Sequence, residues 1–404
     1  MAYGGTALGR YEGRAVFVPY AIPGETVRVT LVEDKRRFAY ARLLEVLAES
    51  PDRIPPRCPH FGPGRCGGCQ WQHINYPAQL RWKREVLRDQ LRRIGGFEDP
   101  PVLETLPSPS PWGYRNRLTL HALPDGRLGM WRANSREIEP IQECAIADPR
   151  LMNLLRSLDL ELPGLQRLTL RAGAAEDDLM LVFETENDDP PALEADFPLS
   201  CVLLLEDGTP VNLIGRNYVT EIVASYPYRV TAGRFFQVNT GVAETLLRLV
   251  SEWLAPDETM TVLDAYCGVG LFTLPLAERA GYVVAVEADP WAVEDLLVNT
   301  ADQENVEVIE GSVEAVLSDL DVTFDGVVVD PPRAGLDVVV VEALAGMRPD
   351  RIVYVSCDPA TLARDLKRLT DNGYRLVQVQ PVDMFPQTYH IESVSLLTWA
   401  GHEG

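Results

Sequence analysis

A cysteine near the end of the chain stands where its thiol can act as a nucleophile. Cys357 follows the apolar run IVYVS and precedes PATLARDL, which is typical of a helix with Asp358 as its N-terminal cap and Pro359 in its first turn. A helix N-terminus stabilises a thiolate, which is the reactive form of cysteine. Cys201 and Cys267 lie in apolar or glycine-rich surroundings, and we interpret both as structural.

A glycine-rich turn follows another apolar run in the last third of the chain. In LDAYCGVGLF, Gly268 and Gly270 would let the backbone approach a ligand, and Glu287 further on could accept hydrogen bonds from ribose hydroxyls. Thr273 replaces the third glycine of the dinucleotide fingerprint. Because S-adenosylmethionine has no pyrophosphate to bind, this shortened motif favours it over NAD as the cofactor.

A carboxylate ends the run VVVDPPRAGL. Asp330 is followed by two prolines that fix the backbone, so it could contact the methionine end of the cofactor or order a substrate pocket. The alternative is a structural Asp that caps the next helix or binds Arg333.

Four further cysteines could form a metal site. Cys58, Cys66 and Cys69 in CPHFGPGRCGGC, with Cys144 downstream, supply the ligand set of an iron–sulfur cluster or of a structural zinc. The sequence carries no secretion signal, so seven cysteines in 404 residues do not indicate a disulfide scaffold.

The elements that would position these residues divide the chain into three segments. Short alternating strands predict a small N-terminal β-barrel, and strand-like runs separated by turns predict a mainly β central segment. The last segment alternates β-branched runs with helical patterns, which predicts a doubly wound α/β sheet. The predicted segments are 1–50, 51–235 and 236–404, with a helix at 76–95 that could pack on the third segment.

Charge is distributed unevenly along the sequence. Residues 1–150 hold 22 Lys and Arg against 17 Asp and Glu, a net +5, whereas 151–404 hold 15 against 42, a net −27. Six cations on the predicted helix favour an RNA-facing surface, although pairing with Glu85 and Asp89 is an alternative. We find no membrane-spanning run and expect a cytoplasmic monomer with no membrane partner.

Five motifs together resemble the RNA 5-methyluridine methyltransferase family. They are FFQVNT at 235–240, DAYCGVGLF at 264–272, DPPRAGL at 330–336, SCDPATLARD at 356–365 and DMFPQTYHIESV at 383–394. The N-terminal strands are similar to the TRAM barrel of many members. The resemblance implies a class I S-adenosylmethionine methyltransferase domain of the Rossmann-like type.

The resemblance assigns roles to individual residues. Cys357 would add to C6 of a uridine, which makes C5 nucleophilic, and a base would remove the C5 proton after methyl transfer. The base would be Glu392, with His390 as a weaker candidate. Gln237 would lie near cofactor and uracil, and the remaining cofactor positions would be Tyr266, Gly268, Gly270, Glu287, Ser312 and Asp330.

The resemblance also has implications for metal and substrate. Members with the CGGCxxQH segment resemble 4Fe-4S proteins, which favours a cluster over zinc at the four cysteines. The substrate would be RNA with an unpaired or flipped uridine, and Phe235 and Tyr389 are candidates to stack on its base. Ribosomal 23S RNA is favoured, and the T-loop of tRNA is the alternative.

Three other activities compete with this interpretation. An RNA 5-methylcytosine methyltransferase would carry a Cys after the Pro of the strand-four motif, and DPPR has none. An amino-group methyltransferase would favour an aromatic residue where Arg333 stands. A non-catalytic RNA-binding or chaperone protein would not need Cys357, Gln237, Asp330 and Glu392 together.

Overall fold

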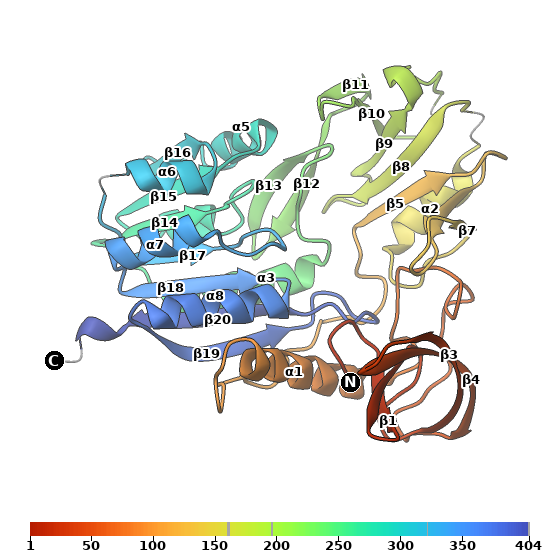
Figure 1. Ribbon diagram of the computed structural model, residues 1–404. Helices are drawn as coiled ribbons and strands as arrows, with labels where there is room; N and C mark the ends of the chain where they lie inside the picture. Colours follow the sequence, from red (N-terminus) through yellow and green to blue (C-terminus); the bar gives the residue numbers. More distant parts are fainter. Residues whose placement is uncertain (160–161, 195–196, 321, 403–404) are drawn as a thin grey trace.

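The structure is a computed structural model that describes residues 1–159, 162–194, 197–320 and 322–402. Figure 1 shows three bodies: a curled N-terminal sheet, a central sheet, and a C-terminal sheet covered by helices. No helix of the described ranges is long and apolar enough to cross a membrane.

The N-terminal body is a four-stranded sheet in the order β1-β2-β4-β3. Side chains alternate along its strands, so that Val16, Val18, Ala39 and Ala41 are buried inside the curl while Tyr40 is exposed on its outer face. This is the sheet that the alternating pattern predicts. The strands are β1 (Ala7–Tyr11), β2 (Arg14–Val18), β3 (Thr26–Asp34) and β4 (Phe38–Ala48).

The central body is a seven-stranded sheet in the order β11-β10-β9-β8-β5-β6-β7, with α2 packed on it. The five strand runs expected between 117 and 207 are all present. The short strands β7 and β11 and the helix α2 were not predicted. The elements are β5 (Arg117–Ala122), β6 (Leu128–Trp131), β7 (Ile138–Pro140), α2 (Pro149–Ser157), β8 (Leu165–Ala172), β9 (Leu179–Thr185), the 3₁₀ turn η1 (Glu186–Asp188), β10 (Ser200–Leu204) and β11 (Pro210–Ile214).

The C-terminal body is the expected doubly wound sheet, in the order β16-β15-β14-β17-β18-β20-β19. Strands β14 to β18 are parallel to one another. Strand β20 runs antiparallel to its two neighbours, β18 and β19, and β19 is the outermost strand on that side. Because the order reverses between β14 and β17, a ligand site is expected at their carboxyl ends. The strands are β14 (Thr261–Ala265), β15 (Tyr282–Glu287), β16 (Val306–Glu310), β17 (Gly326–Val329), β18 (Arg351–Ser356), β19 (Tyr374–Val382) and β20 (Glu392–Trp399).

Six helices lie along this sheet, and their apolar faces join those of the strands in two buried clusters. A hairpin, β12–β13, packs against α3 and α5. Its residues Val219, Val223 and Tyr228 belong to the core under the sheet, although the sequence placed them in the central segment. The elements are β12 (Tyr218–Val223), β13 (Tyr226–Thr231), α3 (Thr240–Leu254), α4 (Thr273–Ala277), α5 (Pro290–Asn299), α6 (Val313–Asp319), α7 (Val338–Met347), α8 (Pro359–Asp371) and the 3₁₀ turn η2 (Ala400–His402).

The basic helix α1 (Tyr76–Arg93) packs against α8 and β19 of the C-terminal body. Asn75 caps it by accepting a hydrogen bond from the backbone of Ala78. Lys83 does not belong to the expected RNA-facing row of cations, because it is fully buried against Asp383. The other five cations pair with carboxylates, as the alternative allowed: Arg81 with Asp52, Arg84 with Glu104, Arg88 and Arg92 with Asp99, and Arg93 with Asp89.

Candidate functional site

Several predicted site residues lie at one edge of the C-terminal sheet, formed by the carboxyl ends of its parallel strands. Strands β14, β15, β17 and β18 are parallel, so the residues that follow each of them lie at the same edge. These are Tyr266, the end residue Glu287, Asp330 and Cys357. Strand β20 runs the other way and therefore begins at this edge with Glu392.

Strand register places the thiol beside the proposed base. Ser356 at the end of β18 pairs with Ser393 near the start of β20. In an antiparallel pair, the residue after Ser356 faces the residue before Ser393, so Cys357 lies next to Glu392. Thirty-five positions of sequence separate the two residues, and the antiparallel pairing removes that separation.

Three buried acids share this edge of the sheet. Burial raises the pKa of Asp330 to about 7, and the neighbouring charge of Asp264 adds to the rise. Burial and the charge of Asp330 hold the pKa of Glu392 well above its ordinary value. Since one negative charge opposes the next, the carboxyls of Asp330 and Glu392 resist ionisation.

The thiol is less acidic than its place before a helix suggests. Asp358 caps α8 as predicted, because its carboxylate accepts hydrogen bonds from the backbone of Ala360 and Thr361. Burial nevertheless raises the pKa of Cys357 to about 11, and Glu392 and Asp330 add to the rise. The expected lowering by the helix end is therefore outweighed.

Arg333 is the cation that opposes these effects. Its guanidinium lowers the pKa of the Cys357 thiol, and its charge also lowers the pKa of Glu392. From the sequence, this residue was considered as a partner of Asp330 and as an argument against an amino-group methyltransferase, but not as a neighbour of the thiol. Its place three residues after Asp330, on the loop that leaves β17, was the available signal.

The glycine turn after β14 has room for a ligand. Gly268 has a positive φ of 55°, and a Cβ built there would meet nothing within 4 Å. At Gly270, by contrast, a Cβ would lie 2.6 Å from Leu296, so only glycine fits. The Gly268 amide donates to Glu287 at 2.8 Å, and the same carboxylate accepts from the amides of Ala288 and Asp289.

Three further positions around the turn are fixed by hydrogen bonds. The Tyr266 hydroxyl donates to Glu314 on α6 at 2.9 Å, and Ser312 caps that helix through the amide of Ala315. Thr273, which replaces the third fingerprint glycine, donates to Asp264 at 2.6 Å. Burial raises the pKa of Asp264 to about 7.

Gln237 lies on the loop between β13 and α3. It is buried, and its backbone carbonyl accepts a hydrogen bond from the side chain of Asn116. Asn239 on the same loop donates to the Met384 carbonyl at 3.2 Å. The loop that carries Gln237 is thus joined to the loop at 383–391 that leads into Glu392, while the role of the Gln237 side chain stays a prediction.

Helix α1 holds the loop at 383–391 in place. The Lys83 ammonium donates to Asp383 at 2.5 Å and to the Phe385 carbonyl at 3.0 Å. Gln79 exchanges hydrogen bonds with both the backbone and the side chain of Gln387. These supports are 300 or more residues away from their partners in the sequence, and no local motif predicts them.

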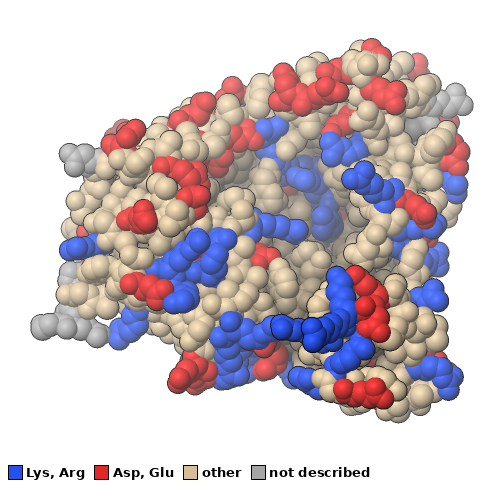
Figure 2. Space-filling model, in the orientation of Figure 1, with Lys and Arg blue, Asp and Glu red and all other residues tan. Residues whose placement is uncertain are grey.

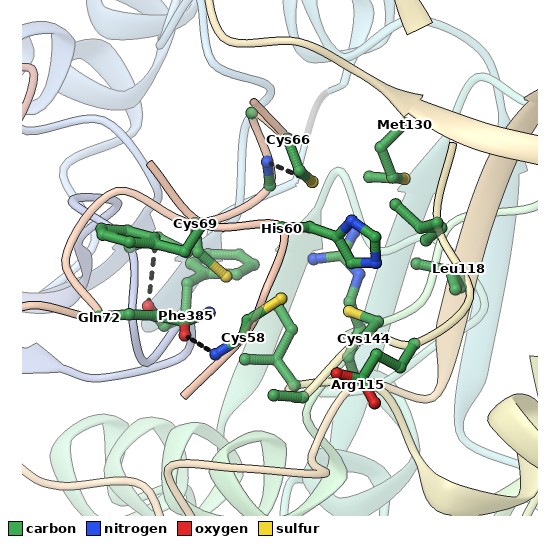
Figure 3. Close-up of a pocket in the computed structure, with 18 of the residues that line it drawn as sticks. Cys58, His60, Cys66, Cys69, Gln72, Arg115, Leu118, Met130, Cys144 and Phe385 are labelled. Carbon is green, nitrogen blue, oxygen red and sulfur yellow. Dashed lines mark hydrogen bonds between the residues drawn. The ribbon is translucent and has the colours of Figure 1, made fainter. Parts of the chain in front are cut away.

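The four predicted metal ligands line one cavity of about 250 Å³. Figure 3 shows the sulfur atoms of Cys58, Cys66, Cys69 and Cys144 around this space. Within the described residues, no three His, Cys, Asp or Glu side chains are close enough to hold a single metal ion. Arg333 and His390 also line the cavity, so it adjoins the site around Cys357.

His390 differs from Glu392 in its surroundings. Its ring packs edge-on against Phe385 and tilted against Tyr389. Burial lowers the pKa of His390 to about 4, and the charge of Arg333 lowers it further. The imidazole is therefore neutral near pH 7.

Basic and aromatic side chains lie at two places outside the site. Figure 2 shows Lys and Arg on the walls of a hollow between the central and C-terminal bodies. On the outer face of the N-terminal sheet, the Tyr40 ring lies 5.5 Å from Phe17 and 5.6 Å from Phe38. Nearby Arg36, Arg37 and Arg42 make no ion pair within the described part of the chain.

The two predicted stacking rings are placed differently. Phe235 is 67% exposed on the loop before α3, where a nucleobase could reach it. Tyr389 is partly buried and packs with Met1 and Trp82 on a small apolar cluster. Tyr389 therefore contributes to the packing between the N-terminal body and the loop at 383–391.

Comparison with known proteins identifies two family matches. Residues 212–400 match the family model of tRNA (uracil-5-)-methyltransferases, and residues 2–44 match the TRAM domain. The second match agrees with the curled sheet at the N-terminus.

Whole-length relatives are similar along nearly the entire chain. An uncharacterized RNA methyltransferase of Gloeobacter violaceus is 39% identical, covering 98% of this chain and 94% of its own. One of Streptomyces avermitilis is 39% identical over 98% of this chain and 96% of its own. The solved tRNA (uracil-54, C5)-methyltransferase of Pyrococcus abyssi, in complex with S-adenosyl-L-homocysteine, is 29% identical with a TM-score of 0.75, covering 97% of this chain and all of that one.

Proposed function

Because this chain belongs to the tRNA (uracil-5-)-methyltransferase family, we propose that it methylates C5 of a uridine in RNA through a covalent bond from Cys357. The observation that carries the proposal is the strand register that sets the Cys357 thiol beside the Glu392 carboxyl. A nucleophile and a base at neighbouring positions are the two groups that substitution at uracil C5 requires.

The proposed reaction has three steps: addition of the thiolate, methyl transfer and elimination. After its proton has passed to water, the Cys357 thiolate forms a bond to C6, and the electron pair of the C5–C6 double bond moves into an enolate. C5 then takes the methyl group from the donor sulfonium, whose sulfur keeps the bonding pair. Glu392 removes the C5 proton, the double bond re-forms, and the C6–sulfur bond breaks to release Cys357.

Arg333 provides the charge that this sequence of steps needs. The thiol and the Glu392 carboxyl both have raised pKa values, so burial disfavours the ionised form of each. The Arg333 guanidinium favours the ionised form of each, and a sulfonium bound at this edge would add a second positive charge. We infer that the thiolate forms after the methyl donor has bound.

S-adenosylmethionine fits the edge of the sheet next to this pair. Gly268 leaves open space over the turn, and Glu287 is oriented by three amides so that free oxygen lone pairs can accept ribose hydroxyls. Asp330 would face the methionine amino group, and Tyr266 and Ser312 line the same edge. The cofactor of the solved relative, in its demethylated form, supports this choice.

We propose that the cysteine cavity holds a 4Fe-4S cluster in preference to zinc. A zinc ion needs its four ligand atoms within about 2.3 Å of one point, and the described residues offer no such group. A cubane places irons and sulfides between its thiolates, so four cysteines spread around a cavity suit it better. Cys58, Cys66, Cys69 and Cys144 would hold it and tie the segment after β4 to the central body.

The RNA substrate is a separate question. We propose 23S ribosomal RNA, in line with the cluster and the TRAM domain, and the tRNA T-loop remains the alternative because the solved relative acts on tRNA uridine 54. The unpaired arginines and ring cluster on the outer face of the N-terminal sheet suit either RNA.

One experiment tests both the proposed methylation of uridine and the proposed RNA substrate. Total RNA from cells with and without this protein is digested, and 5-methyluridine is mapped in ribosomal and transfer RNA. Loss of one 23S position in the deficient cells, restored by wild-type protein and not by Cys357→Ala, is expected. Loss confined to tRNA would replace the ribosomal assignment, and unchanged 5-methyluridine in both would contradict the proposed function.

A further inference from the structure

The N-terminal segment of the chain reaches the catalytic edge of the C-terminal sheet. The Tyr3 hydroxyl donates a hydrogen bond to Asp358, the residue directly after Cys357. Figure 1 shows the N-terminus between the curled sheet and the end of α1, close to the loops of the C-terminal body. A side chain of the N-terminal body therefore stands next to the nucleophile.

This segment is anchored and does not hang free. The indole of Trp71 donates to the Gly5 carbonyl at 3.0 Å, and the Gly5 amide donates to Ala2 at 3.1 Å. Gly5 has a φ of +79°, and a Cβ there would lie 2.6 Å from the Cβ of Tyr389. Only glycine allows this close approach, so the position of Tyr3 is set by packing.

The ring of Tyr3 is open to solvent although its hydroxyl is bound. The residue is 45% exposed, and the charge of Arg333 acts on it together with that of Asp358. Arg333 also acts on the Cys357 thiol, whose pKa it lowers. The exposed ring thus lies beside Asp358, next in sequence to Cys357, where the target uridine would have to arrive.

We propose that Tyr3 is a nucleobase-binding residue whose ring stacks on the base adjacent to the target uridine. A uridine presented to Cys357 has to leave its stack, and its neighbour then loses a stacking partner. An aromatic face beside Asp358 would replace that partner for any base, because every base has a π face.

This inference rests on the proposed function and adds a division of labour to it. The ring binds the RNA, and the hydroxyl holds the ring against Asp358. Phe235, the exposed ring on the loop before α3, belongs to the C-terminal body, whereas Tyr3 comes from the N-terminal one. RNA capture at the catalytic site would therefore depend on the TRAM domain directly.

The test compares Tyr3→Ala and Tyr3→Phe in the full-length protein. Tyr11→Ala is the matched control, because Tyr11 is a 69% exposed tyrosine at the end of β1 in the same N-terminal body. The first readout is methyl transfer to total RNA from protein-deficient cells, giving KM for RNA, kcat and the Kd for S-adenosylmethionine. The second is quenching of 2-aminopurine in a single-stranded oligouridine, which measures stacking without turnover.

Tyr3→Ala is expected to raise KM for RNA about tenfold or more and to abolish most of the quenching, since one base stack is lost. Tyr3→Phe should retain the quenching, and Tyr11→Ala should retain both the quenching and the KM for RNA. The Kd for S-adenosylmethionine should be unchanged in all three variants. If Tyr3→Phe were as impaired as Tyr3→Ala, or if neither changed KM or quenching, stacking would be refuted. Wild-type protein that quenched but transferred no methyl group would instead refute the proposed function.

Discussion

The ion pair between Lys83 and Asp383 offers the sharpest structural prediction. Both side chains are completely buried, with their charged atoms 2.5 Å apart. Replacing Lys83 by Met removes the cation, keeps most of the side-chain volume, and leaves Asp383 buried without a counter-charge. Breaking a buried pair in this way costs about 3–5 kcal/mol of folding free energy.

The matched control lies on the same helix. Arg81 pairs with Asp52 at 2.5 Å, but its side chain is 53% exposed, so water screens the pair. Arg81→Met should therefore cost less than about 1 kcal/mol. In Lys83→Met, a second change of Asp383→Asn should recover much of the loss, because the buried group is then neutral.

Urea denaturation of the four proteins, followed by tryptophan fluorescence, measures these differences. Activity should fall in Lys83→Met as well, since Asp383 begins the loop that carries the chain into Glu392. If Lys83→Met unfolded at the same urea concentration as Arg81→Met, the buried pair would not support the loop, and this account of α1 would be wrong.

Four further outcomes are expected. Glu392→Gln should accumulate a denaturant-resistant protein–RNA adduct, visible on a denaturing gel, because the C5 proton stays in place; clean product release would identify another base. Arg333→Gln should shift the alkylation of Cys357 by iodoacetamide, measured by peptide mass spectrometry, to higher pH, since the guanidinium lowers the thiol pKa; an unchanged profile would exclude this role. Because the Glu392 pKa is raised in the folded protein, ionisation costs stability as pH rises above about 4.5, so wild type should lose stability relative to Glu392→Gln as the pH rises from there; parallel curves would contradict this. Protein purified without oxygen should be brown with a broad visible absorption, and Cys144→Ser should bleach it; a colourless protein with one zinc would replace the cluster.

The sequence predicted the C-terminal body well because its strands are buried on both faces. Runs such as VVAV and IVYV are continuous and β-branched, and helical patterns separate most of them, so periodicity and length agree. The cap by Asp358 is also a local feature, since it needs only the residues on either side of a helix start. The four cysteines were grouped because together they supply a complete set of thiolate ligands, and the structure places all four around one cavity.

Features that depend on distant partners were not predictable. The cations of α1 were interpreted as an RNA-facing surface because their partners, such as Glu104 and Asp383, lie outside the helix and no sequence motif marks them. The acidity of Cys357 was misjudged because the helix end is visible in the sequence, whereas burial and the charges of Glu392 and Asp330 are not. Tyr3 gave no signal, since its contact with Asp358 spans the whole chain.

The central claim is that Cys357 bonds to the uracil ring during methyl transfer. RNA carrying 5-fluorouridine tests it directly, because fluorine cannot leave as a cation and the adduct cannot release the thiol. After incubation with S-adenosylmethionine and nuclease digestion, mass spectrometry should find a methylated fluorouridine nucleotide on the peptide that contains Cys357. Absence of that linkage in protein that methylates ordinary RNA would contradict the mechanism.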